Sequence, residues 1–239
     1  MKKWLNIGVE GGAIWPVKET TIKFGGYEIV LKPATKDYSA SVHTELSKLN
    51  LVEAYTLINR FLSILSWCDD QAMEDFGGWS GSSLPADVAR KKLGISSSID
   101  FPFYRDQETD PKARLALALY REARTVNSIP YEFLGYFKII NLLYNSGKDQ
   151  KQFIKNNLEN LKDPVAIDRF KELKSLGEDV PNFLYESGRC AIAHAYSQPI
   201  LDPDDIKDVR RLSLDLSIIK EMAEIIIEDA LGVSRSILG

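Results

Sequence analysis

Residues 182–195 read Asn-Phe-Leu-Tyr-Glu-Ser-Gly-Arg-Cys-Ala-Ile-Ala-His-Ala. Within this run Leu184, Gly188, Ala191 and Ala195 recur at spacings of three and four, which places them on one face of a helix. Small side chains on such a face allow a neighbouring helix to approach closely. The segment therefore predicts a tightly packed helix within a mostly helical domain.

The sequence on both sides of this segment also follows a helical period, with Asn50 and Asp110 as expected N-caps. A short helix is expected to follow the acidic cap at residues 202–205. Apolar residues at spacings of three and four predict the longer helices over residues 51–67, 111–126, 130–144, 153–161, 165–176 and 215–231.

The first 46 residues follow a period of two instead. Alternating runs over residues 4–9, 20–24 and 27–31, with a fourth candidate over 39–43, predict a small antiparallel meander. Gly25-Gly26 is typical of a two-residue hairpin turn. Because a sheet of this size is not stable alone, we expect it to pack on the helices.

The expected fold class is therefore α+β, a mostly helical bundle with a small N-terminal antiparallel sheet. We expect residues 1–46 to form the β-meander and residues 47–239 to form the helical domain. Residues 69–108 lose periodicity and are rich in glycine and serine at both ends. A connection of this length is typical of a working loop or a mobile one.

The composition is that of an ordinary globular protein. The 239 residues carry a net charge of −4, with 44% hydrophobic and 27% charged residues, enough for a sizeable core. No apolar run reaches the roughly 18 residues of a membrane span and no signal peptide is evident, so a cytoplasmic location without membrane contact is expected. Two cysteines and two histidines are too few for a structural zinc site, and no metal or other cofactor is expected. The acidic balance confines any nucleic-acid role to a local basic groove.

Arg189 and His194 are the best candidates for catalysis. They lie five residues apart on one predicted helix, a spacing that turns an ideal helix by about 140°. Both side chains are long enough to converge at a helix end or across a symmetric contact with a second copy. Imidazole can move a proton near neutral pH, and guanidinium can bind phosphate, so the pair suits phosphodiester cleavage. His43, in a predicted strand without a partner, is expected to be a half-exposed structural histidine.

Three further residues are candidates to support this pair. Glu122 and Lys138 are polar residues on otherwise apolar helices, and either faces the pair or lies at the surface with its stem over apolar neighbours. Cys190 follows Arg189 directly, and the alternative for this thiol is a buried, inert side chain.

A structural interpretation of the pair stands beside the catalytic one. In that interpretation Arg189 pairs with a carboxylate such as Glu186 or Glu122. His194 is then a helix-end residue close to the negative end of the helix dipole.

The sequence pattern, in which an arginine is followed after four to six residues by a histidine at the end of a helix, resembles that of the HEPN superfamily of compact helical bundles. More narrowly, the sequence looks like the MauJ-like proteins, a group named for a methylamine-utilisation operon. The resemblance covers roughly residues 110–232. It is carried by residues 188–195, 202–205 and 211–216, and by residues 119–123 and 133–140.

The resemblance implies a metal-independent endoribonuclease whose active site forms where two bundles dimerise. In such enzymes the 2′-OH of the cleaved strand attacks the adjacent phosphate and leaves a cyclic phosphate end. His194 would be the general base or acid, and Arg189 would stabilise the developing oxyanion.

The resemblance thus leads us to expect a homodimer, formed through the C-terminal helices, that binds RNA in a host-defence or toxin-like role. A partner protein or an antitoxin is a further candidate partner. The alternative function is a non-catalytic helical dimer that binds a partner protein or a ligand through residues 69–108.

Overall fold

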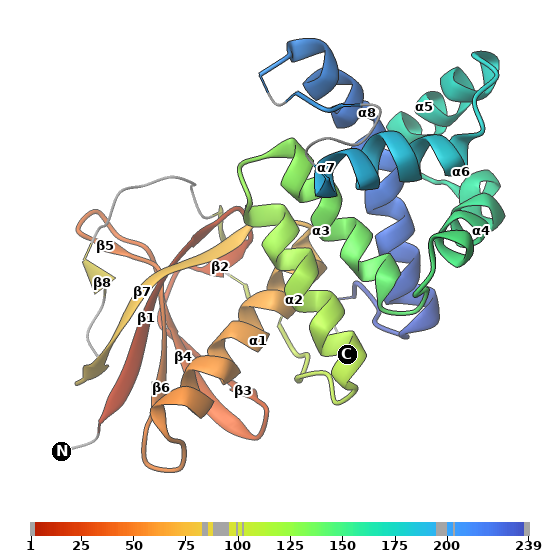
Figure 1. Cartoon of the computed structure of the whole chain (residues 1–239). Helices are drawn as coiled ribbons and strands as arrows, with labels where there is room; N and C mark the ends of the chain where they lie inside the picture. Colours follow the sequence, from red (N-terminus) through yellow and green to blue (C-terminus); the bar gives the residue numbers. More distant parts are fainter. Residues whose placement is uncertain are drawn as a thin grey trace. The chain divides into compact units, whose positions relative to one another are not determined.

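The computed structural model describes the chain in two compact units (Figure 1). One unit comprises Met1–Thr125 with Arg235–Gly239, and the other comprises Val126–Ser234. The sequence places the boundary after residue 46, whereas the units divide after Thr125 because two helices pack with the sheet. The residues that the structure describes are 3–82, 86–87, 96–98, 100–101, 103–194, 200–202 and 204–236.

The first unit is built on a five-stranded antiparallel sheet with the strand order β3-β4-β6-β1-β7 (Figure 1). Its strands are β1 (Trp4–Gly11), β3 (Thr20–Phe24), β4 (Tyr27–Lys32), β6 (Ser41–Glu45) and β7 (Met73–Gly81). Two short ladders accompany it: β2 (Ile14–Pro16) with β9 (Ser96–Ser98), and β5 (Tyr38–Ser39) with β8 (Ala86–Asp87).

The expected strands are present, but the prediction that they form a meander is wrong. β1 pairs with β6 on one side and with β7 on the other, so the first strand of the chain is central in the sheet. The Gly25-Gly26 hairpin turn is confirmed, with φ of 59° and 79° at its two residues.

β7 arises from residues that the sequence assigns to a loop. Glycines interrupt its period of two, and two glycines of the paired strands, Gly78 of β7 and Gly8 of β1, stand where a neighbouring group comes too close for a side chain. A Cβ on Gly78 would lie 3.1 Å from the carbonyl oxygen of Asn6, and a Cβ on Gly8 would lie 2.3 Å from the Phe76 ring. The rest of the predicted loop, within residues 83–99, lies largely outside the described residues.

Two helices complete the first unit, α1 (Leu51–Asp69) and α2 (Pro111–Thr125). Asn50 caps α1, as predicted, by accepting a hydrogen bond from the Glu53 N–H. α1 buries Phe61 against the sheet, where its ring centroid lies 5.7 Å from that of Phe24. This aromatic contact forms part of the core that the sheet alone could not supply.

The second unit is helical, and α8 packs against both α3 and α5 within it (Figure 1). Buried side chains of α3 and α8, including Phe133, Phe137 and Met222, belong to its core. Its helices are α3 (Ile129–Asn141), α4 (Gly147–Asn157), α5 (Pro164–Ser175), α6 (Val180–Phe183), α7 (Ala191–Ala193) and α8 (Ile206–Ile225). Between or after them lie the 3₁₀ turn η1 (Leu158–Asn160) and the π-helical segments η2 (Leu184–Cys190) and η3 (Ile226–Ala230).

Two helix boundaries differ from the prediction. The helix predicted over residues 130–144 ends at Asn141, and Ser146 caps α4, where its hydroxyl accepts the Asp149 N–H at 3.1 Å. The predicted short and long C-terminal helices are one helix, which Asp205 caps and which continues into η3. The charged residues in the middle of α8 interrupt the helical pattern of apolar residues, because Asp215 occupies a buried position there through its ion pairs. Among the described residues, no helix has the length and apolar character to cross a membrane.

His43 is fully buried, so the expectation of a half-exposed side chain is wrong. Its Nδ1 lies 2.6 Å from the Asn6 Oδ1, and its Nε2 lies 2.8 Å from the Ser41 hydroxyl. The Asn6 amide nitrogen donates to the carbonyl oxygens of Trp79 and Ser82, which leaves Oδ1 as the acceptor. Nδ1 of His43 therefore carries the proton, and Nε2 accepts the hydrogen bond from Ser41.

Burial, with a smaller contribution from the Lys32 charge, lowers the pKa of His43 to about 3. Since the unfolded chain binds this proton near pH 6.5, His43 stabilises the fold above that pH and loses the contribution as the pH falls toward 3. We expect His43→Gln to remove about 1.4 kcal/mol per pH unit from the acid dependence of the unfolding free energy between about pH 6 and 4. Urea denaturation at each pH measures the slope of the unfolding free energy against pH for the wild type and for the variant. Equal slopes would contradict the assignment of a buried, neutral His43.

Candidate functional site

Arg189 lies in the π-helical segment η2, which joins α6 to α7 in one continuous helix. At the end of this segment the Ala191 N–H donates to the carbonyl oxygen of Glu186, five residues back. Single π turns inside helices are rare and occur frequently at functional sites. The sequence predicted an ordinary α-helix here, because a π turn leaves no local signal.

The small-residue face of this helix packs as predicted. Leu184, Gly188 and Ala191 are buried, whereas Ala195 lies outside the described residues. A Cβ on Gly188 would lie 2.5 Å from the Phe133 ring of α3. Only glycine therefore permits this close approach of η2 to α3.

The Arg189 guanidinium contacts an aromatic ring and a thiol. Its Cζ lies 5.6 Å from the centroid of the Tyr185 ring, and its Nη1 lies 3.7 Å from the Cys190 Sγ. Its Nε is buried and makes no hydrogen bond within the described part of the chain. The expected alternative, an ion pair with Glu186, is absent, and Glu186 instead lies 3.9 Å from the Lys151 ammonium.

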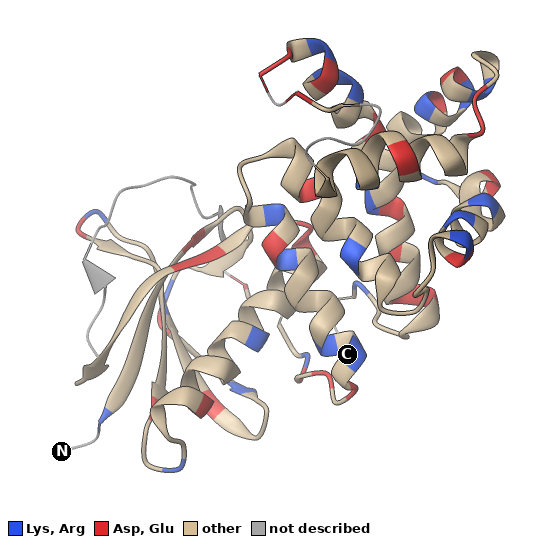
Figure 2. Ribbon diagram, viewed as in Figure 1, with Lys and Arg blue, Asp and Glu red and all other residues tan. Residues whose placement is uncertain are grey.

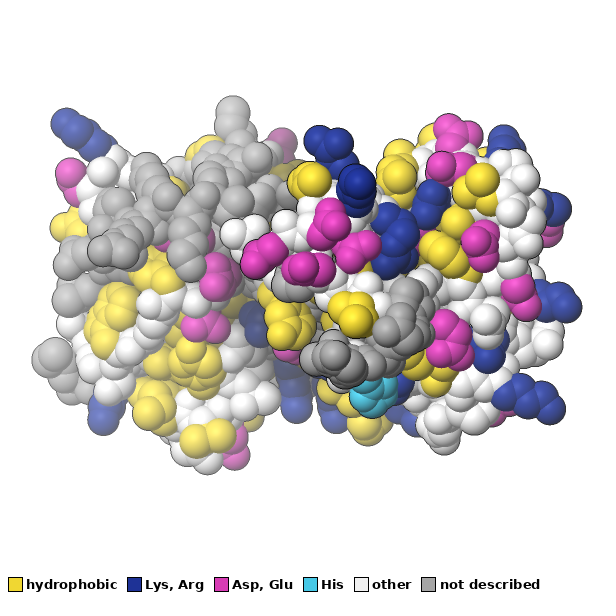
Figure 3. Space-filling model, turned by 45° about the horizontal axis from the view of Figure 1, so that its top comes forward, with side chains coloured by type: hydrophobic (Ala, Val, Ile, Leu, Met, Phe, Trp, Pro, Cys, Tyr) yellow, Lys and Arg dark blue, Asp and Glu magenta, His cyan; other side chains and the backbone are white. Residues whose placement is uncertain are grey.

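His194 ends the helix and is exposed. Its N–H donates to the carbonyl oxygen of Cys190 at 3.0 Å, and its extended backbone stops α7. Because His43 is buried, the histidine side chain visible at the surface in Figure 3 is that of His194. None of the contacts of Arg189 is with His194, so one helix end carries both groups without joining them.

The remaining candidate residues belong to three different elements. Lys138 is exposed on α3, and Glu122 is exposed on α2 in the first unit. Cys190 is partly buried with a free thiol. No group of three or more His, Cys, Asp or Glu side chains in the described ranges could hold a metal ion.

Tyr185 is a site residue that the sequence reasoning missed. The Lys151 ammonium lies 5.2 Å from its ring centroid, so its ring interacts with two cations, Lys151 and Arg189. Burial and then the Cys190 thiol raise the pKa of Tyr185, while Arg189 acts in the opposite direction. Its place one helical turn before Arg189 was the available signal.

A buried ion cluster holds this helix in place. Asp215 of α8 is 1% exposed, and its carboxylate accepts hydrogen bonds from Arg169 of α5 at 2.8 Å and from Arg211 at 2.9 Å. The Arg211 Nη2 also donates to the carbonyl oxygen of Ser187 at 2.9 Å. The cluster therefore links α5 and α8 to the π-helical segment, two residues before Arg189.

A comparison with protein-family models matches part of the chain. The family model of the methylamine utilization protein MauJ matches residues 116–228. The match includes η2, His194 and the three charged residues of the ion cluster. No curated protein and no solved structure matches the chain.

We expect Asp215→Ala to destabilise the protein by about 3–5 kcal/mol, because it leaves the buried guanidinium of Arg169 and its neighbour Arg211 without their shared carboxylate. Thermal and urea unfolding measure the loss. Asp168→Ala is the matched control, since it removes an exposed carboxylate on α5 and should change stability by less than about 0.5 kcal/mol. Equal effects of the two substitutions would show that the cluster is not a structural anchor.

Proposed function

We propose that the helical unit is a HEPN-like bundle and that the protein is a metal-independent endoribonuclease. The observation that carries the proposal is the state of Arg189: among the described residues of its own unit, its guanidinium has no carboxylate partner and its Nε makes no hydrogen bond. An arginine with a purely structural role would normally be paired, because a buried, unsatisfied donor is costly. The exposure of His194 at the end of the same helix adds a proton-transfer group within reach of solvent.

In the proposed reaction the 2′-OH of the RNA attacks the adjacent phosphorus. The new bond joins the 2′-oxygen to phosphorus, and the bond between phosphorus and the 5′-oxygen of the next nucleotide breaks. His194 takes the proton of the 2′-OH or gives a proton to the leaving 5′-oxygen, and Arg189 stabilises the charge on the phosphoryl oxygens. The products are a 2′,3′-cyclic phosphate and a free 5′-hydroxyl.

The neighbours of Arg189 suit this role. The Tyr185 ring restricts where the guanidinium can lie, and the Cys190 thiol accepts only a weak hydrogen bond from it. Such neighbours position the cation without neutralising it. A phosphate is the natural partner for the donors that Arg189 retains.

A shared groove between two copies completes the proposal. The protein acts as a cytoplasmic homodimer formed through its C-terminal helices, so that Arg189 and His194 of both copies face one RNA strand. The role is host defence or a toxin-like one, in which an antitoxin or other partner protein controls the activity. Lys138 and Cys190, which belong to the same unit as Arg189, are supporting residues in this scheme.

Cleavage of a mixed panel of single-stranded RNAs in EDTA tests the activity. We expect cyclic-phosphate products from the wild type, a loss of roughly 100-fold or more in rate for His194→Ala, and a similar loss for Arg189→Ala. Arg210→Ala is the matched control, because it removes an exposed positive charge from α8 and should leave the rate unchanged.

The same samples test the assembly. Light scattering should give twice the chain mass of 26.9 kDa for the wild type and for all three variants. A monomer that still cleaves RNA would contradict the shared groove. Equal background cleavage by all four proteins at high concentration would instead favour the non-catalytic binding module.

A further inference from the structure

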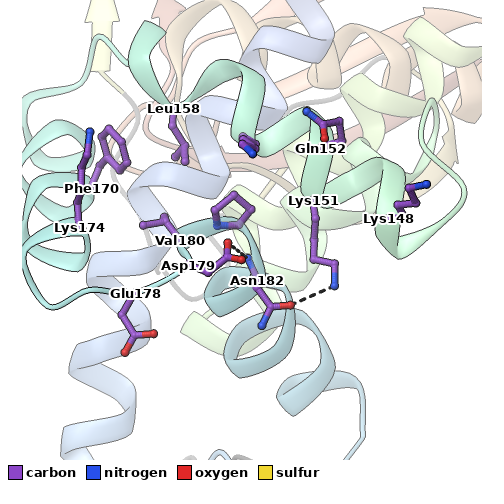
Figure 4. A pocket seen from close by; sticks show the side chains of 12 residues that line it. Lys148, Lys151, Gln152, Leu158, Phe170, Lys174, Glu178, Asp179, Val180 and Asn182 are labelled. Carbon is purple, nitrogen blue, oxygen red and sulfur yellow. Dashed lines mark hydrogen bonds between the residues drawn. The ribbon is translucent and has the colours of Figure 1, made fainter.

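A pocket of about 480 Å³ lies in the helical unit, between α4 and the start of α6 (Figure 4). This volume is within the range of roughly 300–1,000 Å³ that is typical of small-ligand sites. Figure 2 shows positively charged residues on α4. Lys148, Lys151 and Lys155 of this helix line the pocket, together with Lys174 of α5.

The α4 lysines form one wall because they are spaced by three and four residues, on one helical face. Lys148 and Lys155 are exposed and make no ion pair within the described ranges. The Lys151 ammonium donates to the Asn182 Oδ1 at 3.1 Å, which holds it beside the pocket (Figure 4). Because Lys151 also lies 3.9 Å from the Glu186 carboxylate, the charge of the wall that no described ion pair neutralises is that of Lys148 and Lys155.

The negative groups of the pocket do not balance these charges. The Asp179 carboxylate caps α6 by accepting the Asn182 N–H. Glu178 is the other acidic side chain in the lining, and it is exposed. Lys174 is paired with Glu159 at 3.3 Å and is separate from the α4 wall. The positive charges of the lining that have no ion-pair partner in the described part of the chain are therefore those of Lys148 and Lys155 on α4.

The floor of the pocket is apolar. Leu158 and Val180 line it and are almost fully buried. The Phe170 ring lies beside them, with the Lys174 ammonium 5.4 Å from its centroid. A cationic wall beside an apolar floor fits a ligand that has an anionic end and an organic body.

We propose that this pocket binds a small organic phosphate monoester of about mononucleotide size. The phosphate lies at the α4 lysines, which act as point charges for it, and the organic body lies on Leu158, Phe170 and Val180. A phosphate monoester fits better than a carboxylate because its double charge matches more than one lysine. The site does not depend on RNA cleavage, and neither Arg189 nor His194 lines it.

Isothermal titration calorimetry of the full chain with AMP, inorganic phosphate and adenosine tests the proposal. The titrations are made at about 0.15 M salt, which screens non-specific attraction to exposed lysines. We expect saturable binding of AMP, weaker binding of inorganic phosphate and no binding of adenosine. Absence of saturable AMP binding, or equal binding of AMP and adenosine, would overturn the phosphate site.

Substitution of the free lysines locates the bound phosphate. Lys148→Gln and Lys155→Gln should each weaken AMP binding about tenfold, and neither should affect folding because these side chains have no partner to lose. Lys171→Gln is the matched control, since it removes an exposed charge from α5 outside the pocket and should leave the affinity within twofold. An equal loss in all three variants would refute the assignment. Arg189→Ala should bind AMP normally, so this result is separable from the outcome for RNA cleavage.

Discussion

The packing of the helical unit depends on a buried carboxylate. Asp215 lies in the interior, where an unpaired charge would cost several kcal/mol, so its position requires both Arg169 and Arg211. The pair of Arg169 with Asp215 joins α5 to α8, whereas Arg211 lies on α8 itself. Because Arg211 has a donor left after pairing with Asp215, it also binds the carbonyl oxygen of Ser187. The position of η2, and with it the position of Arg189, therefore depends on one carboxylate in a different helix.

The π-helical segment η2 carries the candidate catalytic arginine, Arg189. A π turn changes the regular hydrogen-bond pattern of a helix, and Arg211 supplies a donor to one carbonyl group inside it. The segment must also pack closely against α3, and Gly188 allows η2 to lie against the Phe133 ring. Arg189 is held between these two constraints, and its guanidinium contacts the Tyr185 ring and the Cys190 thiol. Its remaining donors are what make a phosphate ligand chemically reasonable.

The sheet unit contains buried polar groups, which need hydrogen-bond partners inside the sheet. His43 and Asn6 form a buried cross-strand pair whose hydrogen bonds also include Ser41 and two backbone carbonyl groups. Such a group is tolerated because its donors and acceptors find partners. The pair needs β7 beside β1, since the carbonyl oxygen of Trp79 belongs to that strand. Gly78 of β7 leaves room for the close approach of β1, and the glycines of β7 at the same time remove the pattern by which a strand is recognised.

The sequence alone determined the elements whose signals are local. It predicted the Gly25-Gly26 turn, the cap at Asn50, the α+β class and the helix that carries Arg189 and His194, because adjacent residues carry these signals. Only the tertiary structure decided the position of β7, the π turn and the ion cluster around Asp215. It also decided the lysine pocket, in which α4 meets residues from α5 and α6. The physical reason is that these features depend on partners distant in sequence, whose pairing is set by packing and burial and not by local periodicity.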